Sequence, residues 1–288
     1  MTDRRRFWAE ASEAEMAEAC RLRGLRRVEP SIERIAAPVA DLCAAPHGAR
    51  DRQLLHGHGF AIHAVDDASG WAYGETLTDR YSGWIDGSDR HAHPVSAPTH
   101  RLRAQSYGKT NAGLKTAGFV TPLSLGSHLV VLDETDGWAR VACITATPRT
   151  ELYVPVQHLA PIDHTEPDPV SVAERLLGTP YLWGGNSSFG IDCSGLVQIA
   201  CHACDIPCPG DSDQQLAALG RTLPPGTPPQ RGDLMFWPGH VAWVSDPHTL
   251  LHANAHHMAV ALEPIETAID RIAAAGDGPP TRHARLTG

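Results

Sequence analysis

A short motif that occurs twice, 67 residues apart, places the strongest constraint on the fold of this 288-residue chain. Ser69-Gly70-Trp71-Ala72 is echoed by Asp136-Gly137-Trp138-Ala139, and each copy follows a β-rich run and precedes a strand with aromatic residues. Between residues 36 and 162, short apolar runs are separated by Gly, Pro, Asp and Ser, which is typical of short strands and turns. This internal repeat predicts two small β-barrels in tandem.

The sequence on either side of the β-rich stretch follows other patterns. Residues 8–27 mix charged residues with Ala, Leu and Met, which favours a short surface helix. The segment Pro161–Pro169 holds three prolines and three acidic residues and is predicted to be a linker, and helix and strand patterns mix beyond it. We therefore expect an α+β chain with four parts, namely an N-terminal helical segment at 1–30, barrels at 31–95 and 96–163, and an α+β domain at 168–288.

Composition and charge narrow the class of function. The formal net charge of −9 lacks the basic footprint of a nucleic-acid binder. The chain contains no run of about 18 apolar residues that could span a bilayer, and Glu10, Glu13, Glu15 and Glu18 interrupt any secretory apolar run. Seven cysteines form an odd set without framework spacing, which favours reduced thiols. These features predict a cytoplasmic protein with no membrane or nucleic-acid partner.

The α+β domain contains clear element signals. Asp168-Pro169 and Gly178 delimit a short helix, and the loop Gly184-Gly185-Asn186 precedes a second helix from Cys193 to about Cys204. Three later runs are predicted to be strands, with a turn at Asp246-Pro247 between the last two; the runs are 233–237, 240–244 and 249–252.

Cys193 has the position expected of a nucleophile. It stands where a turn ends and an apolar helix begins, between Gly190-Ile191-Asp192 and Ser194-Gly195-Leu196. A thiol on the first helical turn meets unpaired N–H groups and the positive end of the helix dipole, which predicts a lowered pKa. The base would be His240, at the start of a strand, and His252 would orient it. Both histidines lie six residues from Asp246, so a hairpin centred there makes them cross-strand neighbours.

The cysteines of this domain have two other interpretations. A lone cysteine is more often a small buried hydrophobe than a nucleophile. Cys201, Cys204 and Cys208 resemble half of a metal site, which His256-His257 or His56-Gly57-His58 could complete. However, Cys201 and Cys204 lie one helical turn apart behind Cys193, where packing explains them, and no second CxxC pair is present. We expect neither a metal nor another cofactor.

The last third of the chain resembles the NlpC-type cysteine peptidases, a papain-like family that cleaves peptidoglycan stem peptides. Five blocks occur in the family's order, beginning with Tyr181-Leu182-Trp183-Gly184-Gly185 and Asp192-Cys193-Ser194-Gly195-Leu196-Val197-Gln198. The others are Arg231-Gly232-Asp233-Leu234 with Phe236-Trp237, then Gly239-His240-Val241, and Leu251-His252-Ala253. With the two barrels, which resemble bacterial SH3-like domains, most of the chain is similar to γ-D-glutamyl-L-diamino-acid endopeptidases.

The resemblance implies roles for further residues. In that family the tyrosine matched by Tyr181 helps to form the oxyanion region, and acidic groups bind the free α-amine of L-Ala. Tyr81 matches a tyrosine of the first barrel that also contacts this amine. The resemblance assigns substrate binding to Asp192, Ser194, Asp211, Ser212, Tyr81, His58 and Trp183. A buried carboxylate facing an ammonium would select a free N-terminus, because a blocked amine leaves that charge unpaired.

Two positions depart from the family pattern. His56-Gly57-His58 stands where relatives carry a Tyr-Gly-Glu string, so the resemblance implies that His58 replaces an anionic contact to the amine. Gly210 precedes Asp211 where relatives often have arginine, which affects the geometry of that loop. Neither departure touches Cys193, His240 or His252.

The resemblance implies a cysteine endopeptidase that hydrolyses the bond between γ-D-Glu and a diamino acid, diaminopimelate or lysine, in murein peptides with a free N-terminal L-Ala. Its partner is a small peptide, and its role is recycling of wall peptides. The alternatives are an exported lysin acting on intact peptidoglycan and a peptide-binding protein that has lost activity.

Overall fold

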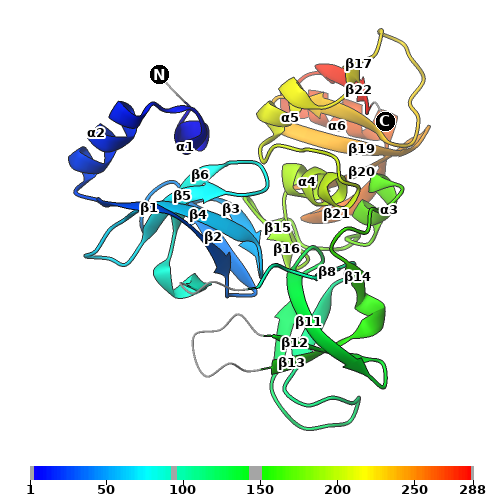
Figure 1. Ribbon diagram of the computed structural model, residues 1–288. Helices are drawn as coiled ribbons and strands as arrows, with labels where there is room; N and C mark the ends of the chain where they lie inside the picture. Colours follow the sequence, from blue (N-terminus) through cyan, green and yellow to red (C-terminus); the bar gives the residue numbers. More distant parts are fainter. Residues whose placement is uncertain (1–2, 92–95, 143–150, 287–288) are drawn as a thin grey trace. The chain divides into compact units, whose positions relative to one another are not determined.

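The structure is a computed structural model that describes residues 3–91, 96–142 and 151–286. The chain divides into two compact units, residues 1–164 and 165–288, each described here by itself. The expected end of the first barrel at residue 95 lies outside the described residues, and so does Cys143. Figure 1 shows the order of helices and strands along the chain.

The N-terminal segment forms a 3₁₀ turn, η1 (Arg4–Arg6), and helices α1 (Phe7–Glu10) and α2 (Glu13–Arg23). Ser12 caps α2 in a reciprocal capping box with Glu15, and Gly24 ends it with a φ of 67° that favours glycine. Trp8, with 2% of its surface exposed, packs with aromatic side chains of the first sheet. Strand β1 begins at Arg26 and not after residue 30, so the helical segment is shorter than expected.

The first sheet holds seven antiparallel strands in the order β3-β2-β6-β5-β4-β1-β7. Strand β7 is only two residues long, and no ladder among the described residues joins it to β3. The sheet is therefore open and not the closed barrel that was expected. A cluster of buried apolar residues that includes Phe60, Ile62 and Tyr81 forms its core. The strands are β1 (Arg26–Ile35), β2 (Val39–Cys43), β3 (Arg50–Leu55), β4 (Gly59–Val65), β5 (Ala72–Thr76), β6 (Ser82–Ile85) and β7 (Arg90–His91), with η2 (Gly87–Asp89) before β7.

The second sheet repeats the topology of the first. Its order is β10-β9-β13-β12-β11-β8-β14, the same order with every strand seven places later along the chain. Gly70 and Gly137, with φ of 78° and 79°, make matching turns before β5 and β12, so the predicted repeat is confirmed. This sheet is also open, and its edge strands contain Pro122 and Pro161, which have no N–H to donate. The strands are β8 (His100–Leu102), β9 (Ser106–Lys109), β10 (Val120–Leu123), β11 (His128–Thr135), β12 (Trp138–Ala142), β13 (Glu151–Pro155) and β14 (Leu159–Pro161), with η3 (Val156–His158) before β14.

The second unit combines helices with a six-stranded sheet in the order β17-β22-β18-β19-β20-β21. Ile265, Ala268 and Ile272 form the apolar stripe of α6 and pack on one face of the sheet, against residues that include Ala242 and Leu250. Helices α3 and α4 contact each other and both contact β19 and β20. Its elements are α3 (Pro169–Glu174), β15 (Asn186–Ser187), β16 (Gly190–Ile191), α4 (Cys193–Ala203), α5 (Ser212–Ala218), β17 (Arg221–Thr222), β18 (Asp233–Trp237), β19 (His240–Asp246), β20 (Thr249–Asn254), β21 (Ala259–Pro264), α6 (Ile265–Ala275) and β22 (Arg282–Arg285).

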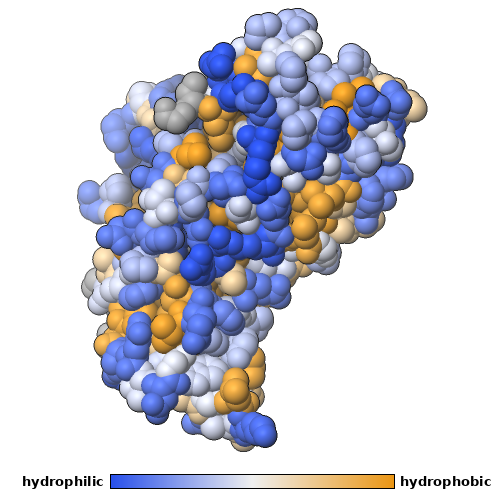
Figure 2. Space-filling view, turned by 90° about the vertical axis from the view of Figure 1, so that its right-hand side faces the viewer, coloured by the Kyte–Doolittle hydropathy of each residue, from blue (hydrophilic) through white to orange (hydrophobic). Residues whose placement is uncertain are grey.

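The element predictions for this unit hold except for the end of the first helix, which stops at Glu174 and continues as turns to Gly178. Asp168 caps α3 by accepting the Val170 N–H, Pro169 is its first residue, and α4 begins at Cys193. The three predicted strands correspond to β18, β19 and β20. On the face drawn in Figure 2, apolar residues form separate patches within a hydrophilic surface. None of the helices in the described part of the chain has the length and apolar character needed to cross a membrane.

Candidate active site

Cys193 begins helix α4, and a capping residue fixes the start of that helix. The Asp192 carboxylate accepts the Gly195 N–H at 2.7 Å and the Ser194 hydroxyl at 2.9 Å. Only 7% of Cys193 is exposed, and its Sγ lies 3.9 Å from the carbonyl oxygen of Gly239. The sulfur also accepts hydrogen bonds from backbone N–H groups, including that of Val241. It therefore meets the backbone on both sides of His240.

The protonation state of this thiol differs from the prediction. Burial raises the pKa of Cys193 to about 12, and the charge of Asp192 acts in the same direction. The N–H groups of Val241, Ser194 and Cys193 itself lower the pKa, as the helix-start argument requires, but burial is the larger effect. The predicted low-pKa thiolate is thus wrong for this structure, in which Cys193 is a neutral thiol.

The hairpin of β19 and β20 brings the two predicted histidines together. His240 Nε2 lies 3.0 Å from His252 Nδ1. The ladder pairs Trp243 with Leu251, and a bulge lies between that pair and the turn. Continuing this register places His252 beside Ala242, two residues from His240. The rings are therefore diagonal neighbours and not the directly opposite pair that was predicted, and diagonal neighbours on one face are still close enough for rings to meet.

A carboxylate and a guanidinium extend this line of polar groups. His252 Nε2 lies 3.0 Å from Glu263 Oε2 on β21, and Arg271 on α6 donates to both oxygens of Glu263 at 2.9 and 2.7 Å. His252 is fully buried and Glu263 is 4% exposed. The hydrogen bonds from Arg271 lower the pKa of Glu263 to about 2. Burial lowers the pKa of His252 to about 4 and that of His240 to about 3, so both rings are neutral near pH 7.

The loop before α4 carries Tyr181 and Trp183. Burial is the main cause that raises the pKa of Tyr181 to about 12, and the neighbouring acidic groups Cys193 and Asp192 act in the same direction. The Gly184 N–H donates to Asp192 Oδ2 at 3.0 Å and ties the loop to the helix start. Trp183 is 72% exposed, so its ring is available to a ligand.

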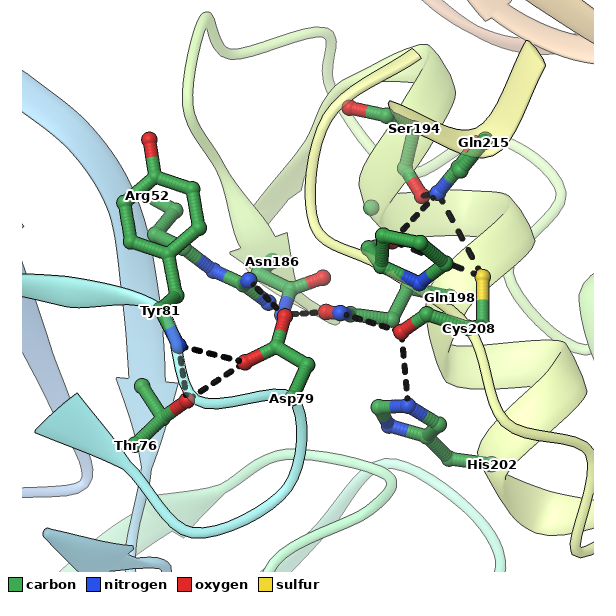
Figure 3. Close-up of polar contacts among 12 residues, drawn as sticks. Arg52, Thr76, Asp79, Tyr81, Asn186, Ser194, Gln198, His202, Cys208 and Gln215 are labelled. Carbon is green, nitrogen blue, oxygen red and sulfur yellow. Dashed lines mark hydrogen bonds and ion pairs between the residues drawn. The ribbon is translucent and has the colours of Figure 1, made fainter. Parts of the chain in front are cut away.

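Helix α5 is fixed to the start of α4 by a buried glutamine. Gln215 Nε2 donates to the carbonyl oxygens of Ser194 and Pro209, both at 2.9 Å (Figure 3). Asp211 occupies the N-cap position of α5 and Ser212 is its first residue. This connection holds the Asp211-Ser212 segment against the turn that carries Cys193 and Ser194.

Tyr81 and His58 lie in the first unit, and their predicted role in amine binding stays a prediction. Tyr81 is 2% exposed, and its N–H donates to Thr76 Oγ1 at 3.1 Å (Figure 3). The Arg52 guanidinium, which is ion-paired with Asp79, lies 5.1 Å from the centre of its ring. His58 is half-buried, with Nε2 3.2 Å from the Gly126 carbonyl oxygen and its ring 4.8 Å from that of His128.

One group of side chains has the composition of a metal site. Donor atoms of His252, His257 and Glu263 lie within 4.8 Å of one another. Both ring nitrogens of His252 already have partners, and both oxygens of Glu263 accept from Arg271. We therefore assign no metal to this group. The three cysteines that resembled half of a metal site, Cys201, Cys204 and Cys208, are free thiols.

Several residues that build the site were missed by the sequence analysis. Glu263 and Arg271 could not be identified from the sequence. A glutamate on an edge strand and an arginine on an amphipathic helix are common surface residues. Gln198 accepts from Asn186 Nδ2 at 3.2 Å and donates to the Cys208 carbonyl oxygen at 3.0 Å, so it joins loop, helix and the segment before α5 (Figure 3). The spacing of Gln198, five residues after Cys193 within the apolar face of a helix, was the available signal.

Two segments of the chain, one in each unit, match known protein families. Residues 178–271 match the model of the NlpC/P60 family, and residues 42–89 match that of the bacterial dipeptidyl-peptidase Sh3 domain. A γ-D-glutamyl-L-lysine dipeptidyl-peptidase of Bacillus subtilis (strain 168) is 30% identical over 118 residues, which cover 40% of this chain and 38% of the relative. The peptidoglycan endopeptidase RipB of Mycobacterium tuberculosis is 34% identical over 109 residues, which cover 32% of this chain and 44% of RipB.

The fold of the chain is also similar to that of a solved structure. The crystal structure of an NlpC/P60 family protein from Bacillus cereus ATCC 10987 superposes with a TM-score of 0.73 at 18% identity, covering 90% of this chain and all of the other. At that identity the likeness concerns the fold alone. The matches to the two enzymes from Bacillus subtilis and Mycobacterium tuberculosis span less than half the length of each.

Proposed function

From the premise that the chain carries an NlpC/P60 domain and a bacterial dipeptidyl-peptidase Sh3 domain, we propose that it is a cysteine peptidase of peptidoglycan peptides. Its bond would be that between γ-D-Glu and the diamino acid in peptides with a free N-terminal L-Ala. One observation carries the proposal: the Cys193 sulfur lies at the start of α4 against the backbone that flanks His240, whose ring meets His252 at 3.0 Å. The name of the Bacillus subtilis relative, a γ-D-glutamyl-L-lysine dipeptidyl-peptidase, supports the choice of bond.

Acylation in this proposal begins from neutral partners. The Cys193 proton passes to His240 Nδ1, the ring nitrogen that does not face His252, as Sγ attacks the γ-carbonyl carbon. Because the pKa of the thiol is raised to about 12 and that of His240 is lowered to about 3, the proton moves during the attack and not before it. The carbonyl oxygen becomes an oxyanion, which the Cys193 N–H and the Tyr181 hydroxyl would stabilise.

Breakdown of that intermediate returns the enzyme to its starting state in two steps. His240 donates its proton to the nitrogen of the diamino acid, the C–N bond breaks, and a thioester to Cys193 remains. Water then attacks the thioester carbonyl while His240 accepts a proton from it. Loss of the thiolate, which takes the proton back from His240, releases L-Ala-D-Glu.

The requirement for a free amine is also a proposal. Asp211 at the start of α5 would bind the ammonium of L-Ala, and Trp183, which is exposed, would cover the peptide. A peptide with this free end has already been separated from the sugar strand. We therefore propose a role in recycling wall peptides in the cytoplasm, which fractionation of producing cells would check.

Mass spectrometry of products from L-Ala-γ-D-Glu-diaminopimelate and its N-acetylated form tests bond and end group together. The expected product is L-Ala-D-Glu, formed from the free peptide and at least about tenfold more slowly from the acetylated one, because a missing ion pair of this kind costs more than about 1.4 kcal/mol. Cys193→Ala should abolish hydrolysis, while Cys204→Ala, at the other end of the same helix, is the matched control. Full hydrolysis by Cys193→Ala would falsify the mechanism.

A further inference from the structure

A buried carboxylate continues the line of polar groups beyond His252. Glu263 Oε2 lies 3.0 Å from His252 Nε2, and two hydrogen bonds from Arg271 hold both of its oxygens. Another titratable group, His257 in the following turn, also approaches this part of the site, and its Nδ1 lies 3.0 Å from Asn254 Oδ1. With side chains that are 0% and 4% exposed, His252 and Glu263 meet away from bulk solvent.

The charge of Glu263 determines which nitrogen of each ring carries a proton. An ionised carboxylate can only accept a hydrogen bond, so His252 Nε2 must be the donor. A neutral imidazole has one N–H, so His252 Nδ1 is then the acceptor and His240 Nε2 must donate to it. The remaining nitrogen, His240 Nδ1, is left with a lone pair. Each step follows from the one before because each of the two contacts, His252–Glu263 and His240–His252, is a hydrogen bond in which one atom donates a proton and the other accepts it.

We propose that Glu263, held in place by Arg271, is a positioning residue that sets both imidazole tautomers and so leaves His240 Nδ1 as the base. This inference rests on the proposed function, because the base is needed only if Cys193 is the nucleophile. Glu263 does not touch the reacting atoms. It acts through His252, and the ion pair with Arg271 keeps it in its accepting form.

Glu263→Gln is the informative variant because it keeps the shape of the side chain and removes its charge. Arg271 donates to a different oxygen from each of its two nitrogens, so the amide loses one of these bonds in either orientation, and with its NH₂ in the place of Oε2 it faces His252 Nε2. His252 would then accept at Nε2 and donate from Nδ1, and His240 would carry its proton on Nδ1. We expect kcat to fall by about 10³–10⁴-fold, the size of loss caused by a wrong tautomer, with KM within about threefold.

The matched control is Glu266→Gln, the same change at an exposed residue in the first turn of α6, which should leave kcat unchanged. A direct readout is long-range ¹H–¹⁵N spectroscopy of the full chain labelled with [¹⁵N]histidine, which distinguishes the two tautomers of each ring. The wild type should show protonated Nε2 on both His240 and His252, and Glu263→Gln should show protonated Nδ1. Unchanged tautomers in the variant, or kcat within about threefold of the wild type, would overturn the inference.

A second variant covers the case in which Glu263→Gln does not fold. Arg271→Gln leaves the carboxylate in place but removes the cation that lowers its pKa, so the acid limb of the kcat profile should move to higher pH. An unmoved acid limb would contradict the assigned role. The tautomers are measured without substrate, so they test this inference even if the wild type does not cleave the peptide. Cleavage that survives Cys193→Ala refutes the proposed function alone.

Discussion

Acid should destabilise the second unit through His252, a fully buried ring. Burial lowers its pKa from 6.5 to about 4, so the folded chain keeps the ring neutral at pH values where the unfolded chain protonates it. Between these two values the unfolded state binds more protons, and stability therefore rises with pH and is lost as the pH falls below 6.5. Above pH 6.5 the ring is neutral in both states and contributes no pH dependence.

The size of the loss follows from the two pKa values. At pH 5 the ring is still mostly neutral in the folded chain. In the unfolded chain it is mostly protonated, because pH 5 lies 1.5 units below the unfolded pKa of 6.5. Each unit corresponds to about 1.4 kcal/mol, so His252 alone should remove about 2 kcal/mol of unfolding free energy, or about 30-fold in the equilibrium constant. Protonation of His240 is disfavoured in the same way, and it adds to this loss in the wild type.

Urea unfolding at pH 7 and at pH 5 would measure this loss. Because the chain has two units, the unfolded fraction should be read by brief hydrogen exchange at one fixed pH, followed by mass spectrometry of peptides from β19 and β20. The side chain introduced by His252→Gln does not titrate. Between the two pH values the unfolding free energy of this variant should therefore change by about 2 kcal/mol less than that of the wild type. His248→Gln, in the exposed turn of the same hairpin, is the control. Equal pH dependence in wild type and His252→Gln would refute the argument.

Three further outcomes test the description of the site. Alkylation of Cys193 by iodoacetamide should accelerate steadily from pH 7 to pH 9, because the pKa of the thiol is raised to about 12; a plateau below pH 7 would contradict the effect of burial. Tyr181→Phe should lower kcat by about 10²–10³-fold if the hydroxyl stabilises the oxyanion, and an unchanged kcat would remove it from that role. Gly195→Ala would place a Cβ 2.6 Å from the Gly185 carbonyl oxygen and should cost about 1–3 kcal/mol in urea unfolding; full stability would mean that the loop can shift.

Local patterns along the chain were sufficient to predict most elements. The echo of Trp71 at Trp138 indicated two related β units, and their strand orders are the same. The cap at Asp168 and the start of α4 at Cys193 follow from residues within one helical turn, because capping is a short-range interaction. Closure of the sheets could not be predicted this way, since it depends on which strands meet across the edges; β7, two residues long, pairs with β1, and no ladder among the described residues joins it to β3.

Contacts between distant segments determined the chemistry of the site. The sequence by itself identified Cys193, His240 and His252 and their order, and a helix start that lowers a thiol pKa. Only the tertiary structure decided that burial outweighs that effect, because desolvation depends on every segment packed around the sulfur. It also decided the partner of His252, since Glu263 approaches only when β21 pairs with β20 and α6 folds back with Arg271. Short-range signals specify elements, whereas protonation depends on what those elements enclose.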